Sequence, residues 1–267
     1  MVAPRATQPS FLARLVLASL LLLASAASTP AQGTVMVTWE IPTEPAVLVG
    51  GPVFLDAKIQ NNSSDTVRVN MGHHGKWNYE FTLVNPDGTT TPIPAYRQFG
   101  PGPKGTVSVE PHQTRTRRLV FNEWYTFVRP GDYTLKVQLT VLLSSSANVS
   151  WQKEFFEDLA VKVAPRDAEK LREICAKLAE TAVSVNSPEA AADASLALSY
   201  VVDPVAVPFL AKVLKEGEAA AQVNAVRGLT RIGSQEALAA LKSNLATAGP
   251  DLKAKIESAL SQFRPGT

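Results

Sequence analysis

Residues 194–214, ASLALSYVVDPVAVPFLAKVL, are followed 31 positions later by residues 225–245, AVRGLTRIGSQEALAALKSNL. Small and apolar residues recur in register between the two stretches, and some recur a third time near the C-terminus. The matched sets are Ala194, Ala225 and Ile256; Leu198, Leu229 and Leu260; Ala206 and Ala237; Leu210 and Leu241; and Leu214 and Leu245. A period of this length predicts stacked helical pairs, because each pair buries its apolar face only against its neighbours.

Capping signals divide the repeat into helices. Ser187-Pro188 and Asp203-Pro204 each place an N-cap residue before a proline in the first turn, and Ser234 is equivalent to Asp203. Glycines stand where we expect helices to stop, at Gly217, Gly233 and Gly249. An earlier helical stripe consists of Leu171, Ile174, Cys175 and Leu178. We therefore predict a helical repeat domain over residues 167–265.

The repeated stretches also suggest a family. Residues 194–198 with 204–210, and residues 224–229 with 232–238, resemble HEAT-like repeats, in particular the short bacterial kind first noted in bilin-lyase proteins. The resemblance covers roughly residues 168–263 and is poor over residues 168–186, which we expect to form an entry cap. It implies an α-solenoid that binds proteins, and it does not imply lyase activity.

The preceding part of the chain has a period of two. Val35, Val37 and Trp39 alternate with residues whose side chains we expect to face outward. Similar alternation marks segments near 53–60, 79–83, 107–109, 119–121, 133–141 and 151–163. Short strands separated by Gly, Pro and Asn turns are typical of an antiparallel sandwich. The run RPGDYTL at residues 129–135 resembles the corner of immunoglobulin-like domains, in which a tyrosine, here Tyr133, bonds back to the main chain. The prediction is an immunoglobulin-like β-sandwich over residues 34–164.

The N-terminus has the pattern of an export signal. Arg5 and Arg14 flank an apolar run at residues 15–23, and small residues at 24–26 or 29–31 suit a cleavage site. The apolar run is shorter than the roughly 20 residues that a membrane anchor needs. We predict a signal peptide over residues 1–31 and an exported mature chain, periplasmic or secreted, without a membrane span.

Charge and cysteine content narrow the function. Two of the 26 cations, Arg5 and Arg14, lie in the predicted signal, so the 24 that remain equal the 24 Asp and Glu residues. A nucleic-acid-binding protein normally has a basic stripe, so we expect no nucleic-acid partner. The single cysteine, Cys175, excludes an intrachain disulfide and favours a bacterial envelope over a eukaryotic secreted protein.

The histidines are the candidates for metal binding. His73 and His74 are adjacent and flanked by glycines, and His112 is the third histidine in the chain. Adjacent residues on a strand point to opposite faces, so the pair could hold one ion only from a loop. Zinc sites usually need three or four converging ligands, and an exposed turn is the competing interpretation. We predict no bound metal or cofactor.

Aromatic and arginine side chains are the candidates for partner binding. Trp77, Arg117, Trp124 and Tyr125 belong to the residue types favoured at interaction hot spots, although packing in the sandwich core is the competing interpretation. The sandwich loops at residues 71–78, 95–105 and 122–131 are expected to form a second surface beside the helical array.

These observations give one leading hypothesis and two alternatives. The leading one is an exported, non-enzymatic scaffold that binds a protein partner through the helical array or the sandwich loops. One alternative is a metal-dependent enzyme or binder built around His73 and His74. The other, by analogy of fold alone, is a sandwich that inhibits peptidases.

Overall fold

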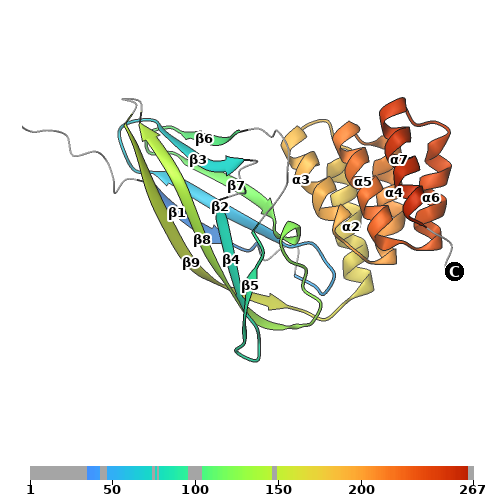
Figure 1. Cartoon of the computed structure of the whole chain (residues 1–267), viewed down its shortest axis with the longest axis horizontal. Helices are drawn as coiled ribbons and strands as arrows, with labels where there is room; N and C mark the ends of the chain where they lie inside the picture. The colour runs from blue at the N-terminus through green and yellow to red at the C-terminus, as the bar shows by residue number, and fades with distance from the viewer. Residues whose placement is uncertain are drawn as a thin grey trace, which may run out of the picture. The chain divides into compact units, whose positions relative to one another are not determined.

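The computed structural model describes residues 35–42, 47–73, 76, 78–95, 104–145 and 149–263. The chain from Val35 onward is one compact unit. Within the described residues an antiparallel β-sandwich precedes a region of six α-helices (Figure 1), so the predicted fold class is confirmed. The predicted signal peptide lies outside the described residues, and among the helices that are described none is both long and apolar enough to cross a membrane.

The sandwich has a smaller and a larger sheet. The smaller sheet has the order β1-β2-β7, with β1 at Val35–Glu40, β2 at Phe54–Asn61 and β7 at Thr114–Val120. The larger sheet has the order β5-β4-β8-β3-β6, with β9 paired to β8. Its strands are β3 (Val67–His73), β4 (Tyr79–Val84), β5 (Thr90–Ile93), β6 (Lys104–Val109), β8 (Gly131–Ser145) and β9 (Ser150–Val163).

The central strand β8 is long enough to pair with β3, β4 and β9 of the larger sheet. Its first half, Thr134–Leu139, pairs with β4, and Leu142–Ser145 pair with β3, while β9 pairs along nearly its whole length. Its side chains alternate between the core and the outside, and Leu135, Leu139 and Leu143 are fully buried. Burying one leucine is worth about 1.5–3 kcal/mol, so the period-two pattern fixes which face of β8 points inward.

Two strands are additional to those predicted. β3 begins with clear alternation at Val67, Val69 and Met71, and continues to His73 through Gly72, which has a φ of 83°. Residues 71–73 of the predicted loop at 71–78 are therefore strand, as are residues 104 and 105 of the loop at 95–105. β5 is short and mostly exposed, so its sequence, TTPI, lacks an apolar face that could have indicated a strand.

The predicted tyrosine corner is confirmed. The Tyr133 hydroxyl donates a hydrogen bond of 2.9 Å to the carbonyl oxygen of Arg129, four residues earlier. The ring packs among other aromatic side chains of the core, with its centroid 5.0 Å from that of Phe127. The corner therefore ties the loop before β8 to the core at the point where the chain enters the larger sheet.

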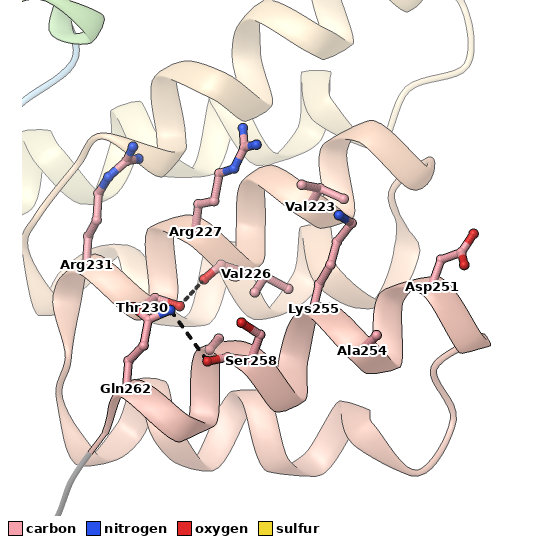
Figure 2. A pocket seen from close by; sticks show the side chains of 11 residues that line it. Val223, Val226, Arg227, Thr230, Arg231, Asp251, Ala254, Lys255, Ser258 and Gln262 are labelled. Carbon is pink, nitrogen blue, oxygen red and sulfur yellow. Dashed lines mark hydrogen bonds between the residues drawn. The ribbon is translucent and has the colours of Figure 1, made fainter. Parts of the chain in front are cut away.

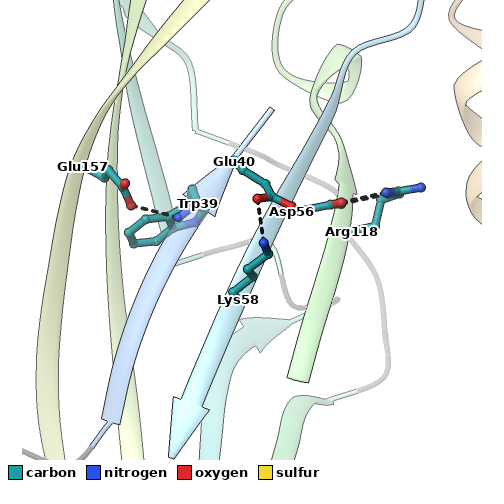
Figure 3. A network of polar contacts seen from close by, with 6 residues as sticks. All are labelled: Trp39, Glu40, Asp56, Lys58, Arg118 and Glu157. Carbon is teal, nitrogen blue, oxygen red and sulfur yellow. Dashed lines mark hydrogen bonds and ion pairs between the residues drawn. The ribbon is translucent and has the colours of Figure 1, made fainter. Parts of the chain in front are cut away.

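Side chains connect the outer edges of β1 and β9, which belong to different sheets. The backbone N–H of Trp39 donates to a Glu157 carboxylate oxygen at 2.8 Å (Figure 3), and the Lys153 ammonium donates to the Val35 carbonyl at 2.7 Å. Desolvation lowers the pKa of Lys153. Charged side chains here satisfy backbone groups of β1 that would otherwise be open to pairing with another chain.

The smaller sheet contains a strong ion pair. Asp56 on β2 is almost fully buried, and both of its carboxylate oxygens accept from Arg118 on β7, at 2.8 and 2.6 Å (Figure 3). This two-point contact compensates the loss of water around the carboxylate. Phe54 lies beneath the same guanidinium, which is 5.1 Å from the ring centroid.

The helical region begins after a short link. Its helices are α2 (Ala168–Ala182), α3 (Pro188–Ser199), α4 (Val207–Glu216), α5 (Ala219–Ile232), α6 (Gln235–Leu245) and α7 (Pro250–Gln262), with a 3-10 turn, η2 (Pro204–Ala206), before α4. The predicted N-caps are confirmed: the side chains of Ser187, Asp203 and Ser234 accept from the backbone N–H groups of Ala190, Val205 and Ala237.

Glycines end two helices as predicted, but a third prediction is wrong. Gly217 and Gly233 are the C-cap residues of α4 and α5, and Gly233 has a left-handed φ of 66°. Gly249 instead precedes α7 as its N-cap, because α6 already ends at Leu245. Pro250 therefore starts a helix rather than following one, in agreement with the preference of proline for the first turn.

The helices stack in two layers. α3 packs against α5 and α5 against α7, while α2 packs against α4 and α4 against α6. The residues matched by the 31-residue period all belong to or pack against one apolar cluster, and Ala225, Ile256, Leu210 and Leu241 are at most 1% exposed. The period therefore records a continuous core shared by successive helices.

The first helices also contact the sandwich within the same compact unit. Leu171 and Ile174 of α2 form an apolar cluster with Leu48, and Ala197 of α3 forms another with Phe54 and Val120. In the link, Arg166 donates to the two carboxylate oxygens of Asp203 at 2.5 and 3.2 Å. This pair raises the pKa of Arg166 and lowers that of Asp203.

Candidate interaction surface

An open groove of about 800 Å³ lies between α5 and α7 (Figure 2). Its floor contains Val226 and Ala259, both at most 5% exposed, and Val223 lies beside them. The Thr230 hydroxyl also lines the groove but donates to the Val226 carbonyl of its own helix at 2.7 Å (Figure 2). The floor is therefore mainly apolar.

Two of the residues that α7 contributes to the groove are short, and Arg231 of α5 reaches from the edge of the groove towards α3. Ala254 and Ser258 line the α7 side. Arg231 of α5 instead lies over Tyr200 of α3, with the guanidinium carbon 4.0 Å from the ring centroid. It also donates to the Ser199 carbonyl and hydroxyl oxygens at 2.9 and 3.2 Å. The space between α3 and α5 is thus covered, and the space between α5 and α7 is not.

Positive charge predominates at the rim of the groove. Arg227 and Arg231 of α5 and Lys255 of α7 line it together with a single acidic residue, Asp251. All four are exposed, and within the described part of the chain none of these four side chains forms an ion pair. Desolvation raises the pKa of Tyr200, and Arg231 opposes that shift.

Of the predicted interaction residues, Trp124 and Tyr125 lie in the sandwich, outside the groove. Trp124 and Tyr125 follow a 3-10 turn, η1 (Phe121–Glu123), and pack partly buried against the sandwich core. The Trp124 ring centroid is 5.2 Å from that of Phe81, and the Tyr125 centroid is 5.3 Å from that of Phe127. Trp77 lies outside the described residues. These positions agree with the competing interpretation, in which the aromatic side chains contribute to packing.

Arg117 lies where β7 meets α3. Its guanidinium is 3.5 Å from the carboxylate of Glu189, whose side chain is largely exposed. Asp193, one helical turn further along α3, has its pKa raised to about 6, mainly by burial and also by Glu189, while Arg117 acts in the opposite direction. The sequence had given no reason to select Asp193.

Of the three histidines, only His112 is described in full. His112 is exposed in the turn between β6 and β7 with a left-handed φ of 57°. The backbone of His73 ends β3, whereas its side chain and the whole of His74 are outside what the structure describes. Among the described residues no group of three or more His, Cys, Asp or Glu side chains converges. Cys175 is buried and free of a disulfide, and desolvation raises its pKa to about 12.

The groove residues stand at outward positions of the repeat, which the apolar period of 31 does not mark. Outward positions at the same period change from one helix to the next: Leu196, Arg227 and Ser258 are equivalent, as are Tyr200, Arg231 and Gln262. A comparison of these sets would have separated α5, with two arginines, from α7, with short or neutral residues. It would not have located the groove, because that depends on which way Arg231 turns.

Comparisons with known proteins give weak structural likenesses. The PapD-like domain of human CEP192 is 12% identical, with a TM-score of 0.28, over 48% of this chain and 87% of that one. The CARDB domain of the PF1109 protein from Pyrococcus furiosus is 16% identical (TM-score 0.25; 49% and 90% covered). The putative ApaA protein from Bordetella pertussis is 11% identical (TM-score 0.29; 49% and 92% covered).

With TM-scores below 0.3, these likenesses identify neither a family nor a function for this chain. No protein-family model matches the chain, and no curated protein does. The HEAT-like assignment of the helices therefore has no family match and stays a prediction.

Proposed function

We propose that this chain is an exported, non-enzymatic interaction protein whose helices form a short HEAT-like array that binds a protein partner. The observation that supports it is the open groove of about 800 Å³ between α5 and α7. Stacked helical pairs use their inward faces for the shared core, so their outward faces are available for binding. The proposed export rests on the pattern of residues 1–31.

The chemistry of the groove suits docking. The half-buried Val223 and the exposed Ala254 supply apolar area from which water can be displaced, and the cations at the rim supply orientation. Arginine is enriched at interaction hot spots because its planar head makes several directed hydrogen bonds while its stem packs on apolar surface.

The sandwich has a structural part in this proposal. Helical arrays need their end units covered, because a terminal helix would otherwise expose the apolar face that a neighbour normally buries. Leu171 of α2 and Ala197 of α3 are fully buried in clusters that include Leu48 and Phe54 of the sandwich region. We infer that the sandwich covers the first end of the array.

Site-specific photo-crosslinking in cells that make the protein with its own leader tests the function. A benzophenone amino acid replaces Ser258 in the groove, Lys215 on α4, or Lys162 on the outer side of β9; all three residues are exposed. We expect a discrete adduct with another exported protein from at least one helical position and none from Lys162. The absence of adducts from both helical positions, with normal folding and export, would refute the proposal.

A further inference from the structure

The groove between α5 and α7 differs in charge from the region around it. Residues 165–267 contain 12 cations and 12 anions. The groove lining contains Arg227, Arg231 and Lys255 against Asp251 alone. The groove therefore has a local excess of positive charge in a region that is neutral overall.

This charge is specific to the α5–α7 groove and is not a property of the repeat. The residues equivalent to Arg227 are Leu196 and Ser258, and the residues equivalent to Lys255 are Asp193 and Asn224. Between α3 and α5 the corresponding surface has Tyr200 covered by Arg231. The α5–α7 groove, by contrast, has cations beside the half-buried Val223 and the exposed Ala254.

Arg231 is held in place before any ligand arrives. Two hydrogen bonds to Ser199 and the stacking on Tyr200 fix its guanidinium. The guanidinium has five N–H donors, so it retains donors for a carboxylate. A side chain that is already ordered loses little conformational entropy on binding, which favours affinity.

We propose that the α5–α7 groove binds a short acidic segment of the partner protein, with carboxylates at Arg227, Arg231 and Lys255 and apolar side chains on Val223 and Ala254. This inference rests on the proposed function. α5 has 14 residues and is about 21 Å long, which matches an extended segment of about six residues. A nucleic acid fits less well, because Asp251 interrupts the rim and the floor is apolar.

Fluorescence anisotropy with a labelled twelve-residue peptide of alternating Glu and Leu tests the proposal. The corresponding Lys and Leu peptide and a twelve-nucleotide oligothymidylate are the comparison probes. We expect the acidic peptide to bind at least tenfold more tightly than either, and to weaken about tenfold between 50 mM and 500 mM salt because ions screen exposed charges.

Paired charge reversals locate the binding. Arg227→Glu with Lys255→Glu is expected to weaken binding of the acidic peptide at least tenfold. The matched control, Lys212→Glu with Lys253→Glu, makes the same change in net charge at exposed positions of α4 and α7 that do not line the groove. It is expected to change the affinity less than twofold. If the reversal disturbs folding, Arg227→Gln with Lys255→Gln replaces it.

Three results would overturn the inference: equal losses in the two charge-reversal proteins, no binding of the acidic peptide, or tighter binding of the oligothymidylate. The last result would favour a nucleic-acid ligand instead. Failure here is distinguishable from failure of the proposed function, because crosslinks from Lys215 on α4 would still identify a partner that binds another face.

Discussion

The close approach of α5 to its neighbours gives the sharpest test of the helical stacking. A Cβ atom added at Gly228 would lie 2.8 and 3.0 Å from the two Leu210 methyl carbons and 2.9 Å from the Ser199 Cα. The leucine can move, but the Ser199 backbone belongs to the end of α3 and cannot retreat without shifting the helix. Alanines occupy the equivalent positions, Ala197 and Ala259, so a small residue recurs at this place in the layer.

The substitution Gly228→Ala sets two effects of opposite sign against each other. Alanine in a helix interior is favoured over glycine by about 1 kcal/mol. Insertion of a methyl group into a packed core costs about 1–3 kcal/mol. Since one of the close contacts is to backbone, we expect the cost to prevail and the protein to lose about 1 kcal/mol, or about 2–4 °C in Tm for a chain of this size.

Urea unfolding followed by circular dichroism at 222 nm measures this difference. Ala254→Gly, at an exposed position of α7, is the control, because it measures the helix-propensity effect without a change in core packing. We expect that control to lose about 1 kcal/mol. If Gly228→Ala were instead more stable than the parent by the same amount, the predicted contact with Ser199 would be wrong, and with it the tight stacking of α5 on α3.

Two further substitutions test the sandwich and its junction with the helices. Tyr133→Phe removes the hydrogen bond to the Arg129 carbonyl and is expected to lower the free energy of unfolding by about 1–2 kcal/mol, whereas Tyr125→Phe should change it by less than about 0.5 kcal/mol. For Asp193, burial raises the pKa in the folded protein to about 6 from an ordinary 3.8, so its contribution to stability is present below pH 4 and lost as the pH rises through 6. The free energy of unfolding of Asp193→Asn should therefore equal that of the parent near pH 4. At pH 7 it should exceed that of the parent by about 1 kcal/mol, after allowance for solvent screening. An equal difference at both pH values would contradict the raised pKa of Asp193.

The elements with strict periodicity were predictable from the sequence. β1 and β8 alternate between buried and exposed residues, and the inward positions of α3, α5 and α7 follow the period of 31. In both cases burial of apolar side chains decides the structure, and burial is what periodicity records. β5 escaped prediction for the converse reason, since three of its four residues are exposed and only pairing with β4 makes it a strand.

The candidate site was much less predictable than the fold. The sequence analysis selected aromatic residues by type, and Trp124 and Tyr125 pack partly buried against the sandwich core. The groove arises from a different cause: Arg231 stacks on Tyr200 instead of covering α7, and Ala254 and Ser258 are too short to close the gap. The direction that the Arg231 side chain takes between neighbouring helices is not specified by residue types alone.

Inward and outward positions of the repeat should be interpreted differently. At inward positions any small or apolar residue that fills the core satisfies the fold, so Ala194 and Ile256 can be equivalent while belonging to one cluster. At outward positions the core imposes no such requirement. Arg227 and Ser258 occupy equivalent positions of α5 and α7, and both are exposed, so the difference between them alters only the surface. The charged groove between these two helices is where we expect that difference to act on the proposed partner.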